Sequence, residues 1–397
     1  MKKNLWIFGA LLATAIIFCI ILFLPIIIPH DKTGSAPIEQ SDIPDSRKTL
    51  RPPDSFKPST MLQADPAHTG DYTNVSGGII PKGQLKWKLN VGSLVHSSPI
   101  IWNRTVYIIS QDIGLNAVDS STGSLKWTKG RYSNTPVPAI DGGILYSSPW
   151  QIEALDAETG EKLWDYYPGN SFDTPTIVNG IVYAGNGNDN VYAFNAKTGD
   201  VRWNFTTIGD NRGLAISNDT VYLMAIHVNR TFASSANRSV DRIETANRIY
   251  ALNAKTGALK WKITPPGNVS CGITIANGTL YAGADNNFYA FDARNGEVLW
   301  SRTIGYCYSA PAVANGFVYV GSDNANLYAL NAENGTLKWN YTMKKNIMLG
   351  GYSPSPSYAD GVVYAGGIDG NLYALEAKTG TLRWNFTTGG YIWSSPA

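Results

Sequence analysis

Hydrophobic and polar positions follow two different patterns along this chain. Near the start, an uncharged apolar run extends from Leu5 to Pro29. About 20 helical residues at 1.5 Å rise cross a bilayer core, so this run predicts one transmembrane helix. From about residue 80 onward, short apolar or alternating stretches are separated by turn pairs such as Asn-Gly and Asp-Gly. This second pattern predicts many short β-strands joined by tight turns.

The residues around the apolar run indicate its orientation. Lys2 and Lys3 precede it, and the positive-inside rule therefore places the N-terminus in the cytoplasm and everything after Pro29 outside the cell. The run is longer than the apolar part of a usual signal peptide, and no Ala-x-Ala cleavage site follows it. We expect a single-pass protein of the cell membrane, with a cleaved signal peptide as the alternative.

The next segment, residues 30–59, is rich in proline, serine and charge and has few apolar residues. It cannot bury a core, so we interpret it as a flexible or extended tether. The chain then divides into an anchor at 1–29, a tether at 30–59 and a folded domain at 60–397.

The folded domain repeats itself. An alanine, a glycine six residues later and a tryptophan four residues after that recur seven times, and a partial copy with only the glycine and tryptophan precedes them. The repeated tryptophans are Trp87, Trp127, Trp164, Trp203, Trp261, Trp300, Trp339 and Trp384. Most copies are about 39 residues apart, which is typical of propeller blades. We expect the glycine to close a turn with positive φ and the tryptophan to cover the joint between blades, which are structural roles.

Each repeat predicts four strands. In 310–339 these are Ala310–Ala314, Phe317–Gly321, Leu327–Leu330 and Thr336–Tyr341, with Asn315-Gly316 as a hairpin turn. The fold class is therefore an all-β propeller of four-stranded blades. Seven blades are complete, and an incomplete eighth position contains the strand of Trp87 and the C-terminal residues 394–397. Whether the ring closes with seven or eight blades stays open.

At these repeats the chain resembles the pyrroloquinoline-quinone (PQQ) repeat family, through the run Tyr-Ala-Leu/Phe-x-Ala-x-x-Gly-x-x-x-Trp. The resemblance covers roughly residues 80–397 and implies the propeller fold. It leaves two functions open, because one fold hosts many activities. One branch contains quinoprotein dehydrogenases, and the other contains scaffold propellers such as the BamB lipoprotein of the bacterial outer-membrane assembly machinery.

The residues favour the scaffold branch. The resembling dehydrogenases carry a vicinal cysteine pair, a calcium site and a catalytic aspartate, whereas Cys19, Cys271 and Cys307 are separate and no Asp-x-Asp-x-Asp-Gly loop occurs. We therefore predict no catalytic residues, no cofactor and no metal, with a PQQ-dependent oxidoreductase as the alternative. Polar turns between the second and third strands are interpreted as backbone-capping turns. They are Asn186–Asn190, Asp285–Asn287, Ser322–Asn326 and Ile368–Gly370.

The net charge and the glycosylation sequons indicate which partners and which side of the membrane to expect. The net charge of +2 gives no basic footprint for nucleic acid. Eleven Asn-x-Ser/Thr sequons exceed the chance expectation and fit a glycosylated domain outside the cell, with an archaeal surface protein as the simplest host. They start at Asn74, Asn103, Asn204, Asn218, Asn229, Asn237, Asn268, Asn277, Asn334, Asn340 and Asn385. We expect an extracellular, protein-binding or scaffold module of the envelope whose partners are other envelope proteins. The sequence does not indicate whether it also binds a small molecule.

Two further features concern the fourth and fifth repeats. The fourth is longer because of an insertion near residues 224–247, which is either a binding loop or a solvated flap. Alignment of the Asn-Gly turns places Cys271 and Cys307 at the start of the first strand in adjacent repeats. An exterior compartment is oxidising, so we predict a disulfide between them, with two buried unpaired thiols as the alternative.

Overall fold

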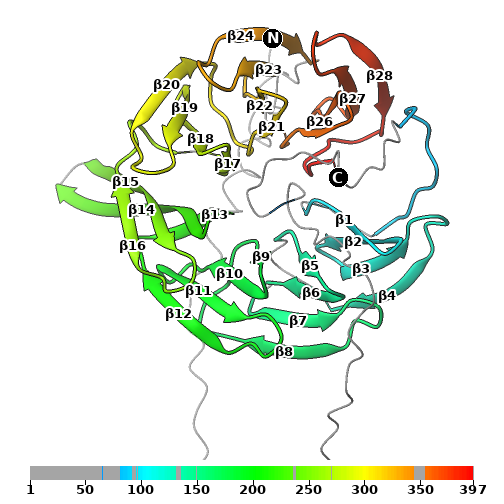
Figure 1. Ribbon diagram of the computed structural model, residues 1–397, viewed down its shortest axis with the longest axis horizontal. Helices are drawn as coiled ribbons and strands as arrows, with labels where there is room; N and C mark the ends of the chain where they lie inside the picture. The colour runs from blue at the N-terminus through cyan, green and yellow to red at the C-terminus, as the bar shows by residue number, and fades with distance from the viewer. Residues whose placement is uncertain are drawn as a thin grey trace, which may run out of the picture. The chain divides into compact units, whose positions relative to one another are not determined.

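In the part of the chain that the structure describes, 28 strands form seven sheets of four strands each, arranged as a ring (Figure 1). The computed structural model describes Asp65 and residues 81–91, 95, 97–130, 136–148, 150–235, 238–269, 271–343 and 354–396. For Arg212 and residues 227–235 and 238–246 it describes the backbone alone. The fold is therefore an all-β propeller with seven four-stranded blades.

The first four blades contain strands β1 to β16. They are β1 to β4 (Ile100–Trp102, Thr105–Ser110, Gly114–Asp119, Leu125–Lys129) and β5 to β8 (Ala139–Asp141, Ile144–Ser147, Ile152–Asp156, Lys162–Tyr166). The next two are β9 to β12 (Thr176–Val178, Ile181–Gly185, Asn190–Asn195, Val201–Thr206) and β13 to β16 (Asp210–Ser217, Thr220–Ser235, Arg238–Asn253, Leu259–Ile263).

The last three blades contain strands β17 to β28. They are β17 to β20 (Thr274–Ala276, Thr279–Ala284, Asn287–Asp292, Val298–Thr303), β21 to β24 (Ala312–Ala314, Phe317–Gly321, Asn326–Asn331, Leu337–Thr342) and β25 to β28 (Ser357–Ala359, Val362–Gly366, Asn371–Glu376, Leu382–Thr387). The four strands predicted within 310–339 are all present, and Phe317–Gly321 has the predicted bounds.

Every blade is an antiparallel meander, called here strands A, B, C and D from the axis outward. First strands of neighbouring blades contact one another around the axis, as β9 does with β5 and β13. Strands B and C are buried on both faces because each blade is covered by two neighbours, whereas strand D alternates exposed and covered positions. The core therefore lies between blades, not inside any one of them.

The joint between blades uses three repeated residues. Trp127 lies against Gly160 of the next blade, whose φ of +76° closes the turn between strands C and D. Its Nε1 donates to the carbonyl of Ala157 at 3.2 Å, and the hydroxyl of Tyr107 donates to the same carbonyl at 2.9 Å. Burial raises the pKa of Tyr107 to about 12, so this hydroxyl stays a donor at physiological pH. The repeat pattern pointed to the glycine and the tryptophan but missed the tyrosine of strand B.

Eight such tryptophan–glycine contacts surround the axis, one more than the complete blades. Trp384 lies against Gly83 and donates to the carbonyl of Pro81 at 2.8 Å, across 303 positions of sequence. Trp87 in turn lies against Gly123. The segment around Gly83 and Trp87 therefore bridges the last blade and the first one. Among the residues described, no sheet is built on this segment.

The structure does not test the predicted transmembrane helix. The part of the chain that the structure describes contains no helix that is long and apolar enough to cross a bilayer. The expected anchor at 1–29 and tether at 30–59 lie outside the described residues, so both stay predictions.

Candidate binding face

The two ends of the blades carry different connections. Because each blade is an antiparallel meander, its A–B and C–D turns lie at one end, which we call the turn face. The B–C loops and the D–A connections to the next blade lie at the other end, which we call the loop face. The turns are short and alike, whereas the loops differ in length and sequence between blades. Loops that vary on a rigid scaffold are where binding usually resides.

Among the residues whose side chains are described, the large exposed aromatic ones all lie on the loop face. Five tryptophan or tyrosine side chains among the described residues are 39% to 62% exposed, and all five lie in B–C loops or after a strand D. They are Trp150, Tyr167, Tyr306, Tyr308 and Tyr391. Exposed aliphatic residues instead concentrate on the outer strands, as Leu125 and Leu337 do. Aromatic residues are enriched in protein interfaces, so the loop face is the candidate binding face.

One aromatic pair on this face is held in place by backbone hydrogen bonds. The rings of Tyr306 and Tyr308 are stacked, with centroids 6.3 Å apart and an interplanar angle of 13°. The backbone N–H of Tyr306 donates to Asp323 Oδ1 at 3.1 Å, and the N–H of Asp323 donates to the carbonyl of Tyr306 at 2.9 Å. These bonds tie the D–A connection to the next B–C loop and so fix two exposed rings.

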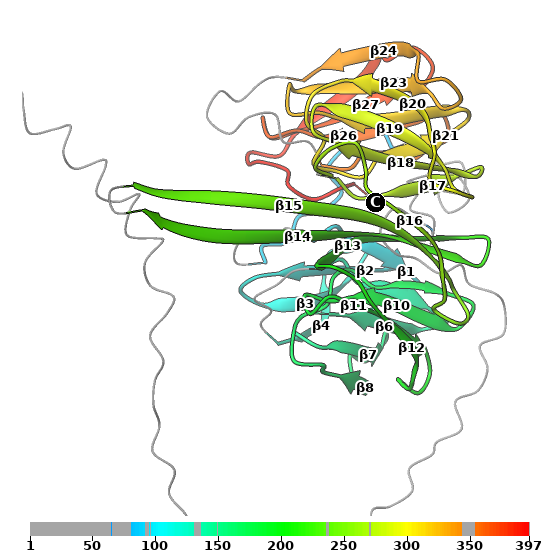
Figure 2. The same cartoon turned by 90° about the vertical axis from the view of Figure 1, so that its left-hand side faces the viewer.

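The longest feature of the loop face is an arm that projects from the fourth blade. Strands β14 and β15 pair continuously from Thr220–Asn253 to Ser235–Arg238. Figure 2 shows this hairpin extending well beyond the other blades. The sequence predicted an insertion between strands B and C near 224–247, as a binding loop or a solvated flap. The structure instead adds these residues to strands B and C themselves, and the choice between a binding element and a solvated flap stays open.

The polar B–C turns bind backbone groups of the protein. Oδ1 of Asn186 accepts from the N–H groups of Asn188 and Asn190, both at 3.1 Å. Oδ1 of Asp369 accepts from the N–H of Asn371 at 3.0 Å. These contacts agree with backbone-capping turns. Within the described ranges, no group of three or more histidine, cysteine, aspartate or glutamate side chains could hold a metal ion.

No described group of side chains marks a site for the cofactor that the family name suggests. The resembling dehydrogenases hold calcium beside the quinone with acidic and amide ligands, and the described residues contain no group of three or more histidine, cysteine, aspartate or glutamate side chains that could hold a metal ion. The two cysteines of the propeller are 36 positions apart in sequence. We therefore derive no step through a quinone.

The two cysteines lie beside the same glycine. Cys271 and Cys307 are both buried, and a Cβ at Gly283 would stand 3.2 Å from one sulfur and 3.5 Å from the other. The N–H of Gly283 donates to Sγ of Cys271 at 2.8 Å, and burial raises the pKa of this thiol to about 12. The structure keeps them as two thiols without a bond between them. Their proximity is compatible with the disulfide, which stays a prediction.

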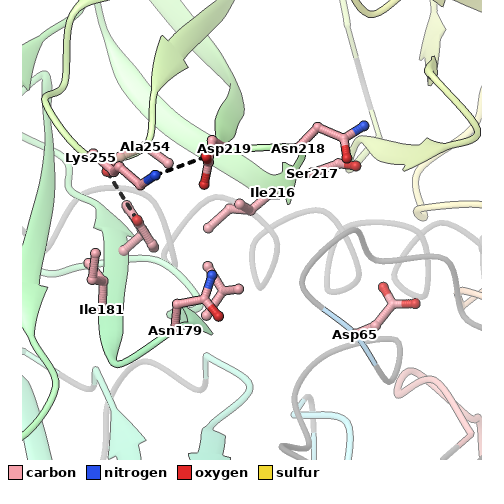
Figure 3. Close-up of a pocket in the computed structure, with 11 residues that line it drawn as sticks. Asp65, Asn179, Ile181, Ile216, Ser217, Asn218, Asp219, Ala254 and Lys255 are labelled. Atoms are coloured by element: carbon pink, nitrogen blue, oxygen red, sulfur yellow. Dashed lines mark hydrogen bonds and ion pairs between the residues drawn. The ribbon is translucent and has the colours of Figure 1, made fainter.

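A cleft of about 750 Å³ opens on the turn face, between the third and fourth blades (Figure 3). Asn179 and Ile181 line one wall, and Asp219 and Lys255 form an ion pair at 3.1 Å on the other. Asp65 lies apart from them at the opposite side of the view. Asp219 is the carboxylate of that wall, and Lys255 neutralises its charge.

The described sequons are all exposed and lie mostly away from the loop face. Asn204, Asn340 and Asn385 are on outer strands, and Asn103, Asn218, Asn277 and Asn334 are in A–B or C–D turns. Asn268 lies in a D–A connection of the loop face. Asn74 lies outside the described residues, as does Asn237, and only the backbone of Asn229 is described. Glycosylation stays a prediction, and among the described positions it would fall on the loop face at Asn229, in the long hairpin β14–β15, and at Asn268.

Comparison with known proteins decides the family. The family model described as outer membrane protein assembly factor BamB matches residues 79–233, 228–307 and 245–390. The chain belongs to this BamB-like β-propeller family. The solved BamB of Moraxella catarrhalis is 18% identical to this member, over 74% of this chain and 86% of that one, with a TM-score of 0.56.

Two enzymes are also similar to this BamB-like chain. Quinohemoprotein alcohol dehydrogenase from Comamonas testosteroni is 17% identical, over 86% of this chain and 75% of that one, with a TM-score of 0.65. At that identity the likeness shows the fold alone. Tetrathionate hydrolase from Acidithiobacillus ferrooxidans is 37% identical over 123 residues, which is 28% of this chain. The match spans about a quarter of that relative's length, 24%.

Proposed function

We propose that this protein is a non-catalytic binding or scaffold module of the cell envelope. In this proposal an N-terminal helix holds it in the cell membrane, and the propeller lies outside and binds other envelope proteins through its loop face. One observation carries the proposal: the exposed aromatic residues and the long hairpin occupy the loop face, whereas most described sequons lie elsewhere. Membership of the BamB-like family supports a scaffold role.

The test compares two surfaces of the same protein. The full chain is purified from its native membrane in mild detergent, and retained partners are identified. Replacing Trp150, Tyr306 and Tyr308 by serine should remove the main partner, because these exposed rings would form the contact. The matched control replaces Leu125 and Leu337 by serine, because these side chains are also exposed but lie on outer strands. Loss of the partner in the control, or retention in the loop-face variant, would argue against this face.

The topology has its own test. Protease added to intact cells or right-side-out vesicles should cut the tether at 30–59 and release the propeller. Full protection of that segment would place the domain on the other side of the membrane.

A second candidate is hydrolysis of tetrathionate or a related sulfur compound. It is supported by the segment that is 37% identical to tetrathionate hydrolase. Incubating the purified chain with tetrathionate and measuring its loss distinguishes the candidates. Turnover that survives removal of the loop-face aromatic residues would favour the enzyme. The PQQ-dependent oxidoreductase is tested by the absorbance spectrum after addition of quinone and calcium, since a bound quinone would change it.

A further inference from the structure

The arm, defined as His227–Ser235 and Arg238–Arg248, has two strands where the rest of the blade has four. Strand β13 pairs with β14 only as far as Ile226, and β16 pairs with β15 only from Ile249. Beyond these points, no strand of the described chain lies along either outer edge of the arm. An unpaired edge presents a row of backbone donors and acceptors that can pair with another strand. A two-stranded ribbon is also marginally stable in water, so a third strand would stabilise the arm.

The charged residues of the two edge strands differ, and only those of β15 favour pairing of the strand with its own copy. The edge of β14 carries only His227 and Arg230 as ionisable residues, so pairing with its own copy offers no opposite charges. The edge of β15 carries Arg242 and Glu244 on either side of Ile243. A two-fold axis through the central position therefore sets arginine opposite glutamate twice. Opposite charges directly across antiparallel strands stabilise the pair, and like charges destabilise it.

We propose that the partner of the arm is the β15 strand of a second copy of this chain, paired antiparallel about Ile243. In this register Arg242 of each copy is opposite Glu244 of the other, and Val240 is opposite Ala246. The match covers seven positions, from 240 to 246, because Asn247 is buried in its own propeller, where it donates to Asn268 Oδ1 at 3.3 Å. Just beyond the match, Arg238 and Arg248 fall opposite one another at each end, and this like-charged pair opposes further pairing.

The register also sets the distance between the two propellers. Arg248 stands at the base of the arm. In this register Arg248 of the second copy lies opposite Arg238 of the first, which is ten residues along the strand from the first copy's own Arg248. At about 3.4 Å per residue, the two bases lie about 34 Å apart along the strands. Because the arm projects clear of the blades (Figure 2), its edge is open to a second copy with the loop faces turned toward one another.

Cross-linking tests the register. Residues directly opposed in an antiparallel pair have Cβ atoms about 4.5–5.5 Å apart, so Ile243→Cys should give a disulfide-linked dimer when the full chain is oxidised with a copper catalyst. Val228→Cys, on the far strand of the same arm, is the matched control and should give no dimer. The unsubstituted chain controls for Cys19, Cys271 and Cys307. Equal dimer from the control, or none from Ile243→Cys, would overturn the proposal.

Charge exchange tests the recognition. Light scattering of the full chain in detergent should give the mass of two chains, and Glu244→Arg should weaken the dimer about tenfold or more because two like-charged pairs replace two opposite ones. The double exchange of Arg242→Glu with Glu244→Arg restores both pairs and should restore the dimer. Equal melting temperatures would show that all variants are folded. A native chain that stays monomeric at every concentration, or a dimer that ignores the single exchange, would refute it.

Discussion

Removal of Trp300 should weaken one joint of the ring by an amount that the structure allows us to estimate. The Trp300 ring lies against Gly335 of the next blade, and its Nε1 donates to the carbonyl of Ala332 at 3.1 Å. It also contacts Tyr281 and Phe288, with centroids 6.0 Å and 6.1 Å away. Replacing a buried tryptophan by alanine costs about 3–5 kcal/mol. Trp300 is half-buried, so we expect about 3 kcal/mol, including roughly 1 kcal/mol for the hydrogen bond.

The assay is thermal unfolding of the full chain, followed by circular dichroism. For a domain of this size, unfolding entropy of about 2.1 cal/mol/K per residue converts a loss of about 3 kcal/mol into a melting-temperature decrease of roughly 5 °C. Trp393→Ala is the matched control, because that side chain follows the last strand and is not in contact with any of the described joint glycines. It should lower the melting temperature by less than about 2 °C. Equal decreases in the two variants would refute the assignment of Trp300 to a joint.

Three other measurements test the joints, the charges and the cysteines. Gly335→Ala should destabilise the protein more than Gly316→Ala. Both glycines have positive φ, but a Cβ at Gly335 would stand 2.5 Å from the Trp300 ring, whereas a Cβ at Gly316 would meet open space. Equal melting temperatures of the two variants would argue against the close packing at Gly335. Arg294 lowers the pKa of the Asp292 carboxyl to about 2, below its unfolded value of about 4. The ionised carboxylate therefore stabilises the folded protein above pH 4, and this contribution is lost as the pH falls to 2. Asp292→Asn should therefore flatten the melting-temperature profile between pH 4 and 2, and an unchanged profile would contradict this. Alkylation of the denatured, unreduced chain should leave Cys271 and Cys307 unlabelled, and labelling of both would rule out the disulfide.

The candidate binding face was only partly predictable. The polar B–C turns and the insertion in the fourth repeat were visible in the sequence, but their place on one face depends on the strands being antiparallel and sequential. Exposed aromatic residues such as Trp150 and Tyr306 could not be distinguished beforehand from buried ones. Burial depends on which loop covers which blade, and a loop's path is not encoded by local periodicity.

The sequence by itself determined the blades, because their rules are local. Turn pairs with positive φ, two-residue alternation and a recurring glycine and tryptophan act within about 40 residues, so they are legible in one repeat and reinforced by seven. Tertiary structure alone decided three things. Tyr107 and its equivalents share an acceptor with the tryptophans, since that carbonyl belongs to the next blade. Trp384 closes the ring on Pro81 and Gly83, about 300 residues earlier. The insertion became an arm because strands β14 and β15 kept pairing beyond the point where their neighbours end.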